Sequence, residues 1–128
     1  MSGFKNLRLS EDILREVSMM IRDDIKDARV HASMVSIVRV ELSGDNSDCK
    51  IYISAVEGLD AAKTAVKGLT SATGMIRREL ADRLHLKRAP DLKFIADNSI
   101  EYSAKLISEM EELEKLRKNE KQKSSDND

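Results

Sequence analysis

Cysteine, proline and aromatic residues are scarce in this chain of 128 residues. Cys49 is the only cysteine, which excludes an intrachain disulfide and favours a reducing compartment. Aromatic residues make up 3% of the chain and tryptophan is missing, so the core must be mainly aliphatic. No run of about 18 apolar residues occurs, and the N-terminus lacks the apolar stretch of a signal peptide. We therefore expect a soluble, cytoplasmic protein without a membrane span.

The residue types that metal sites and active sites need are also few. His31 and His85 lie far apart in the sequence, so together with Cys49 they form no metal-ligand set of normal spacing. No nucleophile–base pair and no phosphate-cradling P-loop is visible. We therefore expect no metal, no cofactor and no enzymatic activity. Cys49 falls on the inward face of a predicted strand, where cysteine is more often buried than reactive.

The charge of the chain is unevenly distributed, although the formal net charge is only −1. Residues 1–60 include 8 basic and 11 acidic residues, and residues 94–128 include 6 and 9. Residues 61–93 include 8 basic and 3 acidic residues, a net charge of +5 between two segments of −3 each. This asymmetry favours an anion-binding face built from the middle of the chain.

Apolar periodicity predicts a helix followed by a hairpin in the first half of the chain. The helix is expected to begin after Ser10, a good N-cap, and to fray near Asp27. Two alternating runs, 34–42 and 49–55, predict strands joined by the turn at 43–47. In the first strand we expect one shared face for Val38, Val40 and Leu42.

The second half of the chain returns to helical spacing. An apolar stripe over 60–84 runs straight through Gly74, which predicts a long helix that bends there. Pro90 ends this helical stretch, and residues 92–96 predict a third strand. The order of elements is that of a single α+β domain, which suits the length of the chain.

A last helix is predicted from about Ser99 to Leu116. Its inward face is expected to consist of Ile100, Ala104, Ile107, Met110 and Leu113. Residues 117–128 contain no apolar side chain and predict a charged, disordered tail, so that the folded domain is expected to span 1–116.

Gly74 lies inside a helical pattern, where glycine costs about 1 kcal/mol relative to alanine. The order of elements resembles the type II KH domain, a module that binds single-stranded nucleic acid through a GXXG loop between two helices. This sequence instead has Ala72-Thr73-Gly74 at that place. An Ala-X-Gly kink of this kind is typical of ribosome-binding factor A, a bacterial family that this chain resembles.

Four further stretches carry the resemblance to ribosome-binding factor A, which covers roughly residues 5–113. They are the corner KDAR at 26–29, the hairpin VRVELSGDNSDCKIYIS, the basic stretch MIRRELADRLHLKRAPDLKF and the closing DNSIEY. Many relatives carry a proline in place of Ala28 and a Pro-Asp turn in place of Gly44-Asp45. Both sites are turns, so these departures alter loop rigidity and leave the expected fold intact.

The resemblance implies a type II KH-like fold, a three-stranded sheet with helices packed on one face. It also implies a monomeric assembly factor that binds the free small ribosomal subunit and its 16S rRNA. Such a factor supports folding and 5′-end processing of the 16S rRNA, matters most in the cold, and leaves before translation, with an assembly GTPase as a possible release partner.

The candidate RNA-binding residues are the basic side chains that follow the kink: Arg77, Arg78, Arg83, Lys87 and Arg88. Helix N–H groups near Gly74 and these cations would meet a phosphate backbone together. Two alternatives stay open: Glu79 and Asp82 could pair with the arginines of an ordinary solvated face, and Gly74 could serve close packing alone. At the level of function, the alternatives are a protein–protein interaction module without RNA contact and, with no supporting residues, a nuclease.

Two aromatic residues are candidates for stacking on bases. Phe94 shares a face with Leu92 and is expected in the core. Tyr52 alternates with Ile51 and Ile53, so it is expected on the exposed face of its strand.

Overall fold

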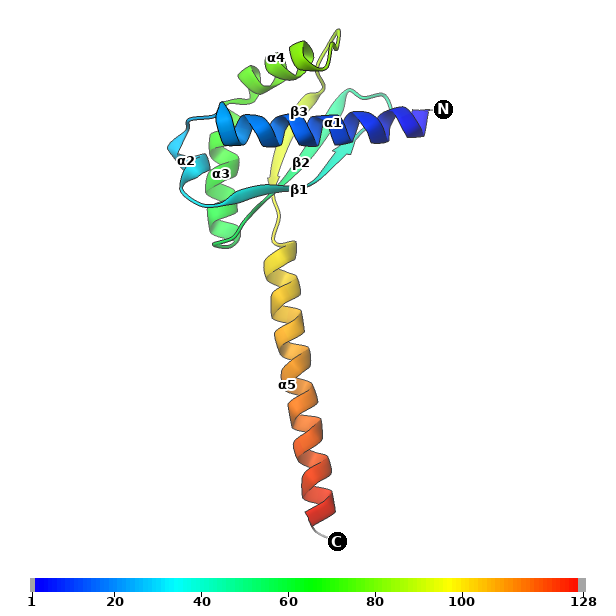
Figure 1. Ribbon diagram of the computed structural model, residues 1–128, viewed down its shortest axis with the longest axis vertical. Helices are drawn as coiled ribbons and strands as arrows, with labels where there is room; N and C mark the ends of the chain where they lie inside the picture. The colour runs from blue at the N-terminus through cyan, green and yellow to red at the C-terminus, as the bar shows by residue number, and fades with distance from the viewer. Residues whose placement is uncertain (1, 127–128) are drawn as a thin grey trace. The chain divides into compact units, whose positions relative to one another are not determined.

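A computed structural model of the protein describes the backbone of residues 2–126 and the side chains of residues 6–99 and 103–120. The chain divides into two compact units, Met1–Asp97 and Asn98–Asp128. The first unit is a mixed α+β domain, and the second is formed by one helix (Figure 1).

Three strands form one sheet in the order β1-β2-β3, with β1 at Val35–Leu42, β2 at Asp48–Ala55 and β3 at Asp91–Ala96. The alternating runs correctly predict the hairpin, because β1 and β2 pair antiparallel. Strand β3 runs parallel to β2, with Phe94 opposite Ile51. A parallel neighbour requires a crossover connection, which the two helices between β2 and β3 supply.

Four helices complete the first unit: α1 at Ser2–Asp23, α2 at Ala28–His31, α3 at Leu59–Ser71 and α4 at Thr73–Arg83. Figure 1 shows α1 crossing the sheet, with α3 beside α2. The helices cover the sheet face that carries Cys49, Ile51 and Ile53, all fully buried. The core is almost wholly aliphatic, as the composition predicts, with these further members: Ile13, Val17, Met20, Ile21, Ile25, Val30, Ala65, Leu69, Ile76, Leu80 and Phe94.

Helix α1 begins well before the predicted N-cap. Ser10 lies inside the helix, where its hydroxyl donates to the Leu7 carbonyl at 2.8 Å. The residues before Ser10 are compatible with a helix, and this outweighs the preference of serine for the N-cap position. At the other end α1 stops at Asp23, four residues before the predicted end near Asp27. Asp27 instead forms the N-cap of the short helix α2.

The predicted face of β1 is interrupted. The register with β2 shifts between Ile37 and Arg39, and Val38 is 37% exposed instead of sharing the inward face of Val40 and Leu42. An extra residue in one strand moves the following side chains to the opposite face, which simple alternation does not foresee.

The hairpin turn is held by Asp45. Its Oδ1 accepts hydrogen bonds from the Ser43 hydroxyl at 2.8 Å, the Ser47 amide at 3.1 Å and the Ser47 hydroxyl at 2.7 Å. These donors lower the pKa of Asp45 to about 2. Asn46 takes the left-handed backbone conformation (φ 62°), which asparagine tolerates better than most residues.

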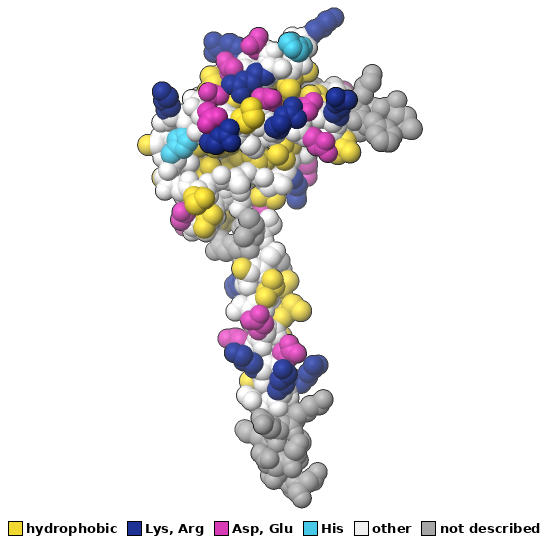
Figure 2. Space-filling view, in the orientation of Figure 1, with side chains coloured by type: hydrophobic (Ala, Val, Ile, Leu, Met, Phe, Trp, Pro, Cys, Tyr) yellow, Lys and Arg dark blue, Asp and Glu magenta, His cyan; other side chains and the backbone are white. Residues whose placement is uncertain are grey.

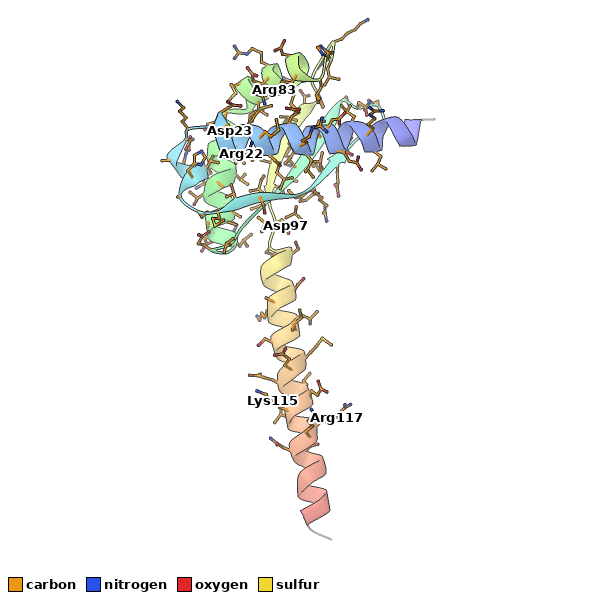
Figure 3. All side chains as sticks on the ribbon, in the orientation of Figure 1. Arg22, Asp23, Arg83, Asp97, Lys115 and Arg117 are labelled. Atoms are coloured by element: carbon orange, nitrogen blue, oxygen red, sulfur yellow. The ribbon has the colours of Figure 1, made fainter. Side chains whose placement is uncertain are left out.

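Helix α5 spans Ser99–Asp126, so the stretch 117–126, predicted as disordered, is helical in the structure. Lysine, glutamate and glutamine favour helix, which accounts for the continuation without apolar residues. Lys115 and Arg117 project from it (Figure 3). None of the described residues of the second unit covers the side chains expected to face inward, namely Ala104, Ile107, Met110 and Leu113, and the side chain of Ile100 lies outside the described residues.

None of the helices within residues 2–126 is long and apolar enough to cross a membrane. In the described part of the chain, no three His, Cys, Asp or Glu side chains are grouped so that they could hold a metal ion.

Candidate nucleic-acid interface

The long helix predicted over 60–84 is interrupted at Ala72. This residue (φ −94°, ψ 5°) ends α3 with its N–H directed to the carbonyls of Gly68 and Leu69, and its own carbonyl accepts from Ile76 in the first turn of α4. The helix is therefore interrupted within the Ala72-Thr73-Gly74 motif, two residues before the glycine. The first turn of α4 begins beside Gly74, which is exposed.

Gly74 does not owe its identity to packing. A Cβ atom built on Gly74 would meet no other atom within 4 Å. The glycine that packing requires is Gly68, where a Cβ would lie 2.7 Å from Cγ2 of Val30 and 3.1 Å from Oδ1 of Asp27. Helix α2 thus lies directly against α3 at Gly68, whereas the space around Gly74 is open to a ligand.

Arg77 is held by the protein itself. Its guanidinium donates to the carbonyls of Pro90 and Ala89, each at 3.0 Å, and pairs with Asp91 at 3.2 Å. These bonds fasten α4 to the segment that leads into β3. Arg77 therefore positions a loop and has little capacity left for a phosphate.

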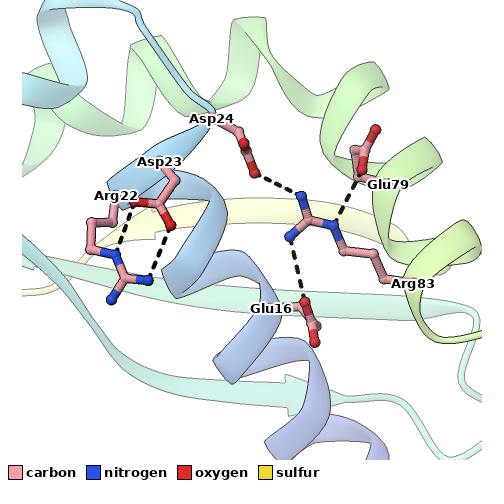
Figure 4. A network of polar contacts seen from close by, with 6 residues as sticks. All are labelled: Glu16, Arg22, Asp23, Asp24, Glu79 and Arg83. Atoms are coloured by element: carbon pink, nitrogen blue, oxygen red, sulfur yellow. Dashed lines mark hydrogen bonds and ion pairs between the residues drawn. The ribbon is translucent and has the colours of Figure 1, made fainter.

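Arg83 is also occupied. It pairs with Asp24 at 2.7 Å, Glu79 at 3.2 Å and Glu16 at 3.5 Å, which joins α4 to α1 (Figure 4). Its hydrogen bond to Asp24 is the main cause that raises the pKa of the guanidinium. Basic and acidic side chains are likewise intermixed over α1 and α4 in Figure 2. With a 27% exposed side chain and three carboxylate partners, Arg83 stabilises the fold.

The other three predicted residues are exposed and divide into two groups. Arg78 lies in α4 one turn after Gly74, whereas Lys87 and Arg88 lie in the loop after the C-terminal end of α4. Among the described residues, none of the three has a hydrogen-bond or ion-pair partner for its side chain. The 11 residues of α4 span about 16 Å, so the single predicted patch becomes two.

Sequence reasoning missed three cations on α3 and in the corner beside it. Lys63 and Lys67 are exposed on α3 at a spacing of one helical turn, and they belong to the same +5 segment. Arg29 reaches the end of α3, where its Nη2 donates to the Ser71 hydroxyl at 3.2 Å. The i, i+4 spacing of the lysines was the available signal, but the proximity of Arg29 is a tertiary feature. We call the set Arg29, Lys63, Lys67, Gly74 and Arg78 the α3–α4 face.

Comparison with known proteins identifies the family. The model of the family "Ribosome-binding factor A" matches residues 5–110. This chain belongs to the ribosome-binding factor A family. Ribosome-binding factor A of Lachnospira eligens is 43% identical over 114 residues, which cover 87% of each chain. That of Trichormus variabilis is 44% identical over 110 residues, covering 86% of this chain and 83% of the relative.

Solved structures of the ribosome-binding factor A family share the fold. The solution structure of a putative ribosome binding factor A from Thermotoga maritima is 28% identical, with a TM-score of 0.63 over 72% of this chain and 86% of its own. The crystal structure of ribosome-binding factor A from Thermus thermophilus is 24% identical, with a TM-score of 0.61 over 71% of this chain and 93% of its own. The expected family and the α+β, KH-like fold are confirmed.

Arg29 is oriented by Asp27, the second residue of the KDAR corner at 26–29. The Asp27 carboxylate accepts from Nε of Arg29 at 3.0 Å, from Nη2 at 2.6 Å and from the Arg29 amide at 2.8 Å. These hydrogen bonds lower the pKa of Asp27 to about 2. The corner thus caps α2 and holds Arg29 beside Ser71 with the same carboxylate.

The lowered pKa of Asp27 predicts an acid-sensitive contribution to stability. A carboxyl whose folded pKa lies below its ordinary value of 3.8 stabilises the fold above that value, and loses this effect as the pH falls towards about 2. The free energy of unfolding should therefore decrease from pH 5 to pH 2 less steeply in Asp27→Asn than in the unmodified protein. Urea unfolding at both pH values measures the difference, and equal slopes would contradict the assignment.

Neither Tyr52 nor Phe94 presents a free aromatic ring to a base. Phe94 is 6% exposed and belongs to the core, as expected. Tyr52 lies on the outer face of β2, but the Arg39 guanidinium covers its ring at 4.0 Å and its hydroxyl donates to Glu41 at 3.1 Å. The ring is therefore already stacked and is a poor candidate for binding a base.

Cys49 is expected to be chemically inert in the folded protein. It is buried, and burial raises the pKa of its thiol to about 12, so the reactive thiolate is nearly missing at neutral pH. Iodoacetamide at pH 8 should therefore modify Cys49 at least about a hundredfold more slowly in buffer than in 6 M guanidinium chloride, as followed by mass spectrometry. Modification at similar rates in both would show that the thiol is accessible.

Proposed function

We propose that this protein binds the free small ribosomal subunit and assists its late maturation, including folding and 5′-end processing of the 16S rRNA. Family membership, at 43% identity over 87% of the chain, is the observation that carries the proposal. It is supported by a homology model of Thermus thermophilus ribosome binding factor A that was fitted into a cryo-EM map of its complex with the 30S subunit. This chain is 25% identical to that protein, with a TM-score of 0.56 over 69% of this chain.

The α3–α4 face is the proposed contact with RNA. Three of its cations, Lys63, Lys67 and Arg29, follow α3 towards its end at Ser71, and Arg78 lies in the second turn of α4. The first backbone N–H groups of a helix such as α4 lack intrahelical partners. Gly74 is exposed and a Cβ there would lie in open space, which leaves room for a phosphate beside this first turn. Arg77 and Arg83, in contrast, act by holding α4 in place.

The proposed mechanism is binding without chemistry. A protein that contacts one rRNA arrangement better than its competitors shifts the population towards that arrangement. We propose that it works in the cytoplasm as a monomer without a cofactor, with an assembly GTPase as a possible release partner.

Sedimentation with purified subunits tests this proposal. The protein should sediment with free small subunits and not with assembled ribosomes. With four phosphate contacts, a plot of log affinity against log salt concentration should have a slope of about −3 to −3.5. Equal binding to free subunits and assembled ribosomes, or to neither, would overturn the proposal.

A protein–protein interaction module is the second candidate function. Five large apolar side chains are exposed on α5 and several are visible in Figure 2: Leu106, Ile107, Met110, Leu113 and Leu116. An apolar docking surface of this kind would give an affinity that depends little on salt. The salt slope of subunit binding therefore separates the two functions.

A further inference from the structure

A cleft of about 370 Å³ lies in the first unit, away from the α3–α4 face. Its walls come from α1, from the β1–β2 turn and from the loop between α4 and β3, which lie on the same side of the domain (Figure 1). The lining residues are Leu9, Asp45, Asn46, Ser47, Leu86, Lys87, Arg88, Ala89 and Pro90. The volume falls in the range of small-ligand sites.

The two basic residues of the cleft are those left unexplained by the α3–α4 face. Lys87 and Arg88 are exposed, and their side chains have no partner among the described residues. Asp45 is the one acidic residue in the lining, and three donors already engage its Oδ1. The lining therefore carries a net charge of +1, with both cations free to bind an anion.

The remaining lining offers an apolar surface and one amide group. Leu9, Leu86 and Pro90 supply the apolar side chains. The amide oxygen of Asn46 is shielded from solvent and has no hydrogen-bond partner in the described structure. A buried acceptor of this kind is costly unless a donor reaches it, and rotation of the Asn46 side chain into the cleft would bring it to the N–H donor that every nucleobase carries on its pairing edge.

We propose that this cleft binds one unpaired nucleotide of the RNA, with its phosphate at Lys87 and Arg88 and its base against the apolar wall and the Asn46 amide. The inference rests on the proposed RNA-binding function and adds a second contact at the opposite end of α4. Unpaired nucleotides are the usual targets of proteins that read RNA through base edges, because such bases can be splayed out into a pocket.

The mode of binding in the cleft can be tested with the full chain and a mixed-sequence single-stranded RNA hexamer. In the 15N-labelled protein, the hexamer should shift the amide resonances of Asn46, Leu86 and Ala89 in addition to that of Gly74. Lys87→Ala with Arg88→Ala should weaken hexamer binding about tenfold and reduce the magnitude of the salt slope by about 0.7, the value for one phosphate on a single strand.

A base contact and a phosphate contact are distinguished by Asn46→Gly. Glycine accepts the left-handed backbone of this position, so the variant removes the amide without straining the turn. We expect binding about threefold to tenfold weaker and an unchanged salt slope. The matched control is Lys50→Ala with Lys93→Ala, which removes two exposed charges from β2 and β3 and should leave hexamer affinity within twofold.

The outcomes separate this inference from the proposed function. Shifts confined to the α3–α4 face, with unchanged affinity in the cleft variants, would overturn the nucleotide site even if the protein sediments with free subunits. Loss of subunit binding by the Lys87 and Arg88 variant without hexamer shifts in the cleft would mean that a protein segment occupies it, which also overturns the inference. Cleft shifts in a protein that fails to sediment with subunits would support the site and reject the proposed function.

Discussion

Lys67→Glu combined with Arg78→Glu is expected to weaken binding to the free small subunit about a hundredfold. Both side chains are exposed and have no partner in the described structure, so their replacement removes no internal contact. A hydrogen bond to a charged group contributes about 1.5 kcal/mol or more, and each lost contact therefore costs about tenfold in affinity. Fluorescence anisotropy or sedimentation over a series of subunit concentrations measures the loss.

The control for this pair is Lys93→Glu. It makes the same change of charge per residue on β3, on the sheet face turned away from the helices, and should cost less than twofold. Each single variant of the α3–α4 face should lose about tenfold, and all variants should unfold at nearly the same urea concentration. An equal loss of affinity in the control would show that the effect arises from the net charge of the protein. The α3–α4 face would then no longer be part of the proposed site.

Arg77 and Arg83 do not allow a clean test of RNA contact, although the sequence places them in the same basic stretch. Replacing Arg83 leaves Glu16, Asp24 and Glu79 close together without their shared cation. Replacing Arg77 frees the carbonyls of Ala89 and Pro90. Variants of either arginine confound a loss of binding with a loss of stability.

The sequence predicts local features of this protein well. Side-chain alternation places both strands of the hairpin, and the apolar stripe of 60–84 contains residues that are buried in the structure, such as Leu69, Ile76 and Leu80. Periodicity reports which face of an element is buried, and burial is what the amino-acid pattern encodes most directly.

The sequence does not reveal which cations are free, because many of their partners are distant in the chain. Of the two nearby acids that the sequence offers as partners, Glu79 does pair with Arg83 and Asp82 does not. The other two partners of Arg83, Asp24 and Glu16, are 59 and 67 residues away. The same holds for Arg29, whose contact with Ser71 spans 42 residues. The charge of a segment can be read from sequence, but the neutralisation of each charge depends on the fold.

The apolar stripe of α5 shows a second limit of prediction from sequence. Helical spacing correctly indicates one apolar face, but it does not identify what covers that face. Leu106, Ile107 and Met110 are exposed, although the pattern alone resembles that of a core helix. Exposed apolar stripes often mark interaction surfaces, which is why the second candidate function rests on this helix.

Gly68→Leu is expected to lower the free energy of unfolding by about 3 kcal/mol, more than any change at Gly74. A Cβ at position 68 would approach Cγ2 of Val30 to 2.7 Å. Val30 is fully buried and its branched side chain has little freedom at χ1, so the contact can be relieved only by moving α2 away from α3. Overpacking of a core costs about 1–3 kcal/mol, and a leucine adds further atoms to the same contact.

Gly74→Ala is the matched variant on the other side of the break. Its added Cβ meets nothing within 4 Å, and alanine favours helix over glycine by up to about 1 kcal/mol, so stability should stay the same or rise. The sequence analysis singled out Gly74 because it lies next to the bend, and gave no sign that Gly68 is the glycine required by packing. Urea unfolding of both variants at pH 7 shows which of the two glycines the fold requires for its stability.

Subunit binding by the two glycine variants connects packing to function. Displacement of α2 at Gly68 would also move the Asp27–Arg29 corner, so Gly68→Leu should lose the Arg29 contact and bind subunits about tenfold more weakly even when fully folded. Gly74→Leu should keep the fold but place a side chain where the phosphate is proposed to approach the N–H groups of α4. If Gly68→Leu proves as stable as the unmodified protein, the close contact of α2 with α3 does not determine the position of Arg29.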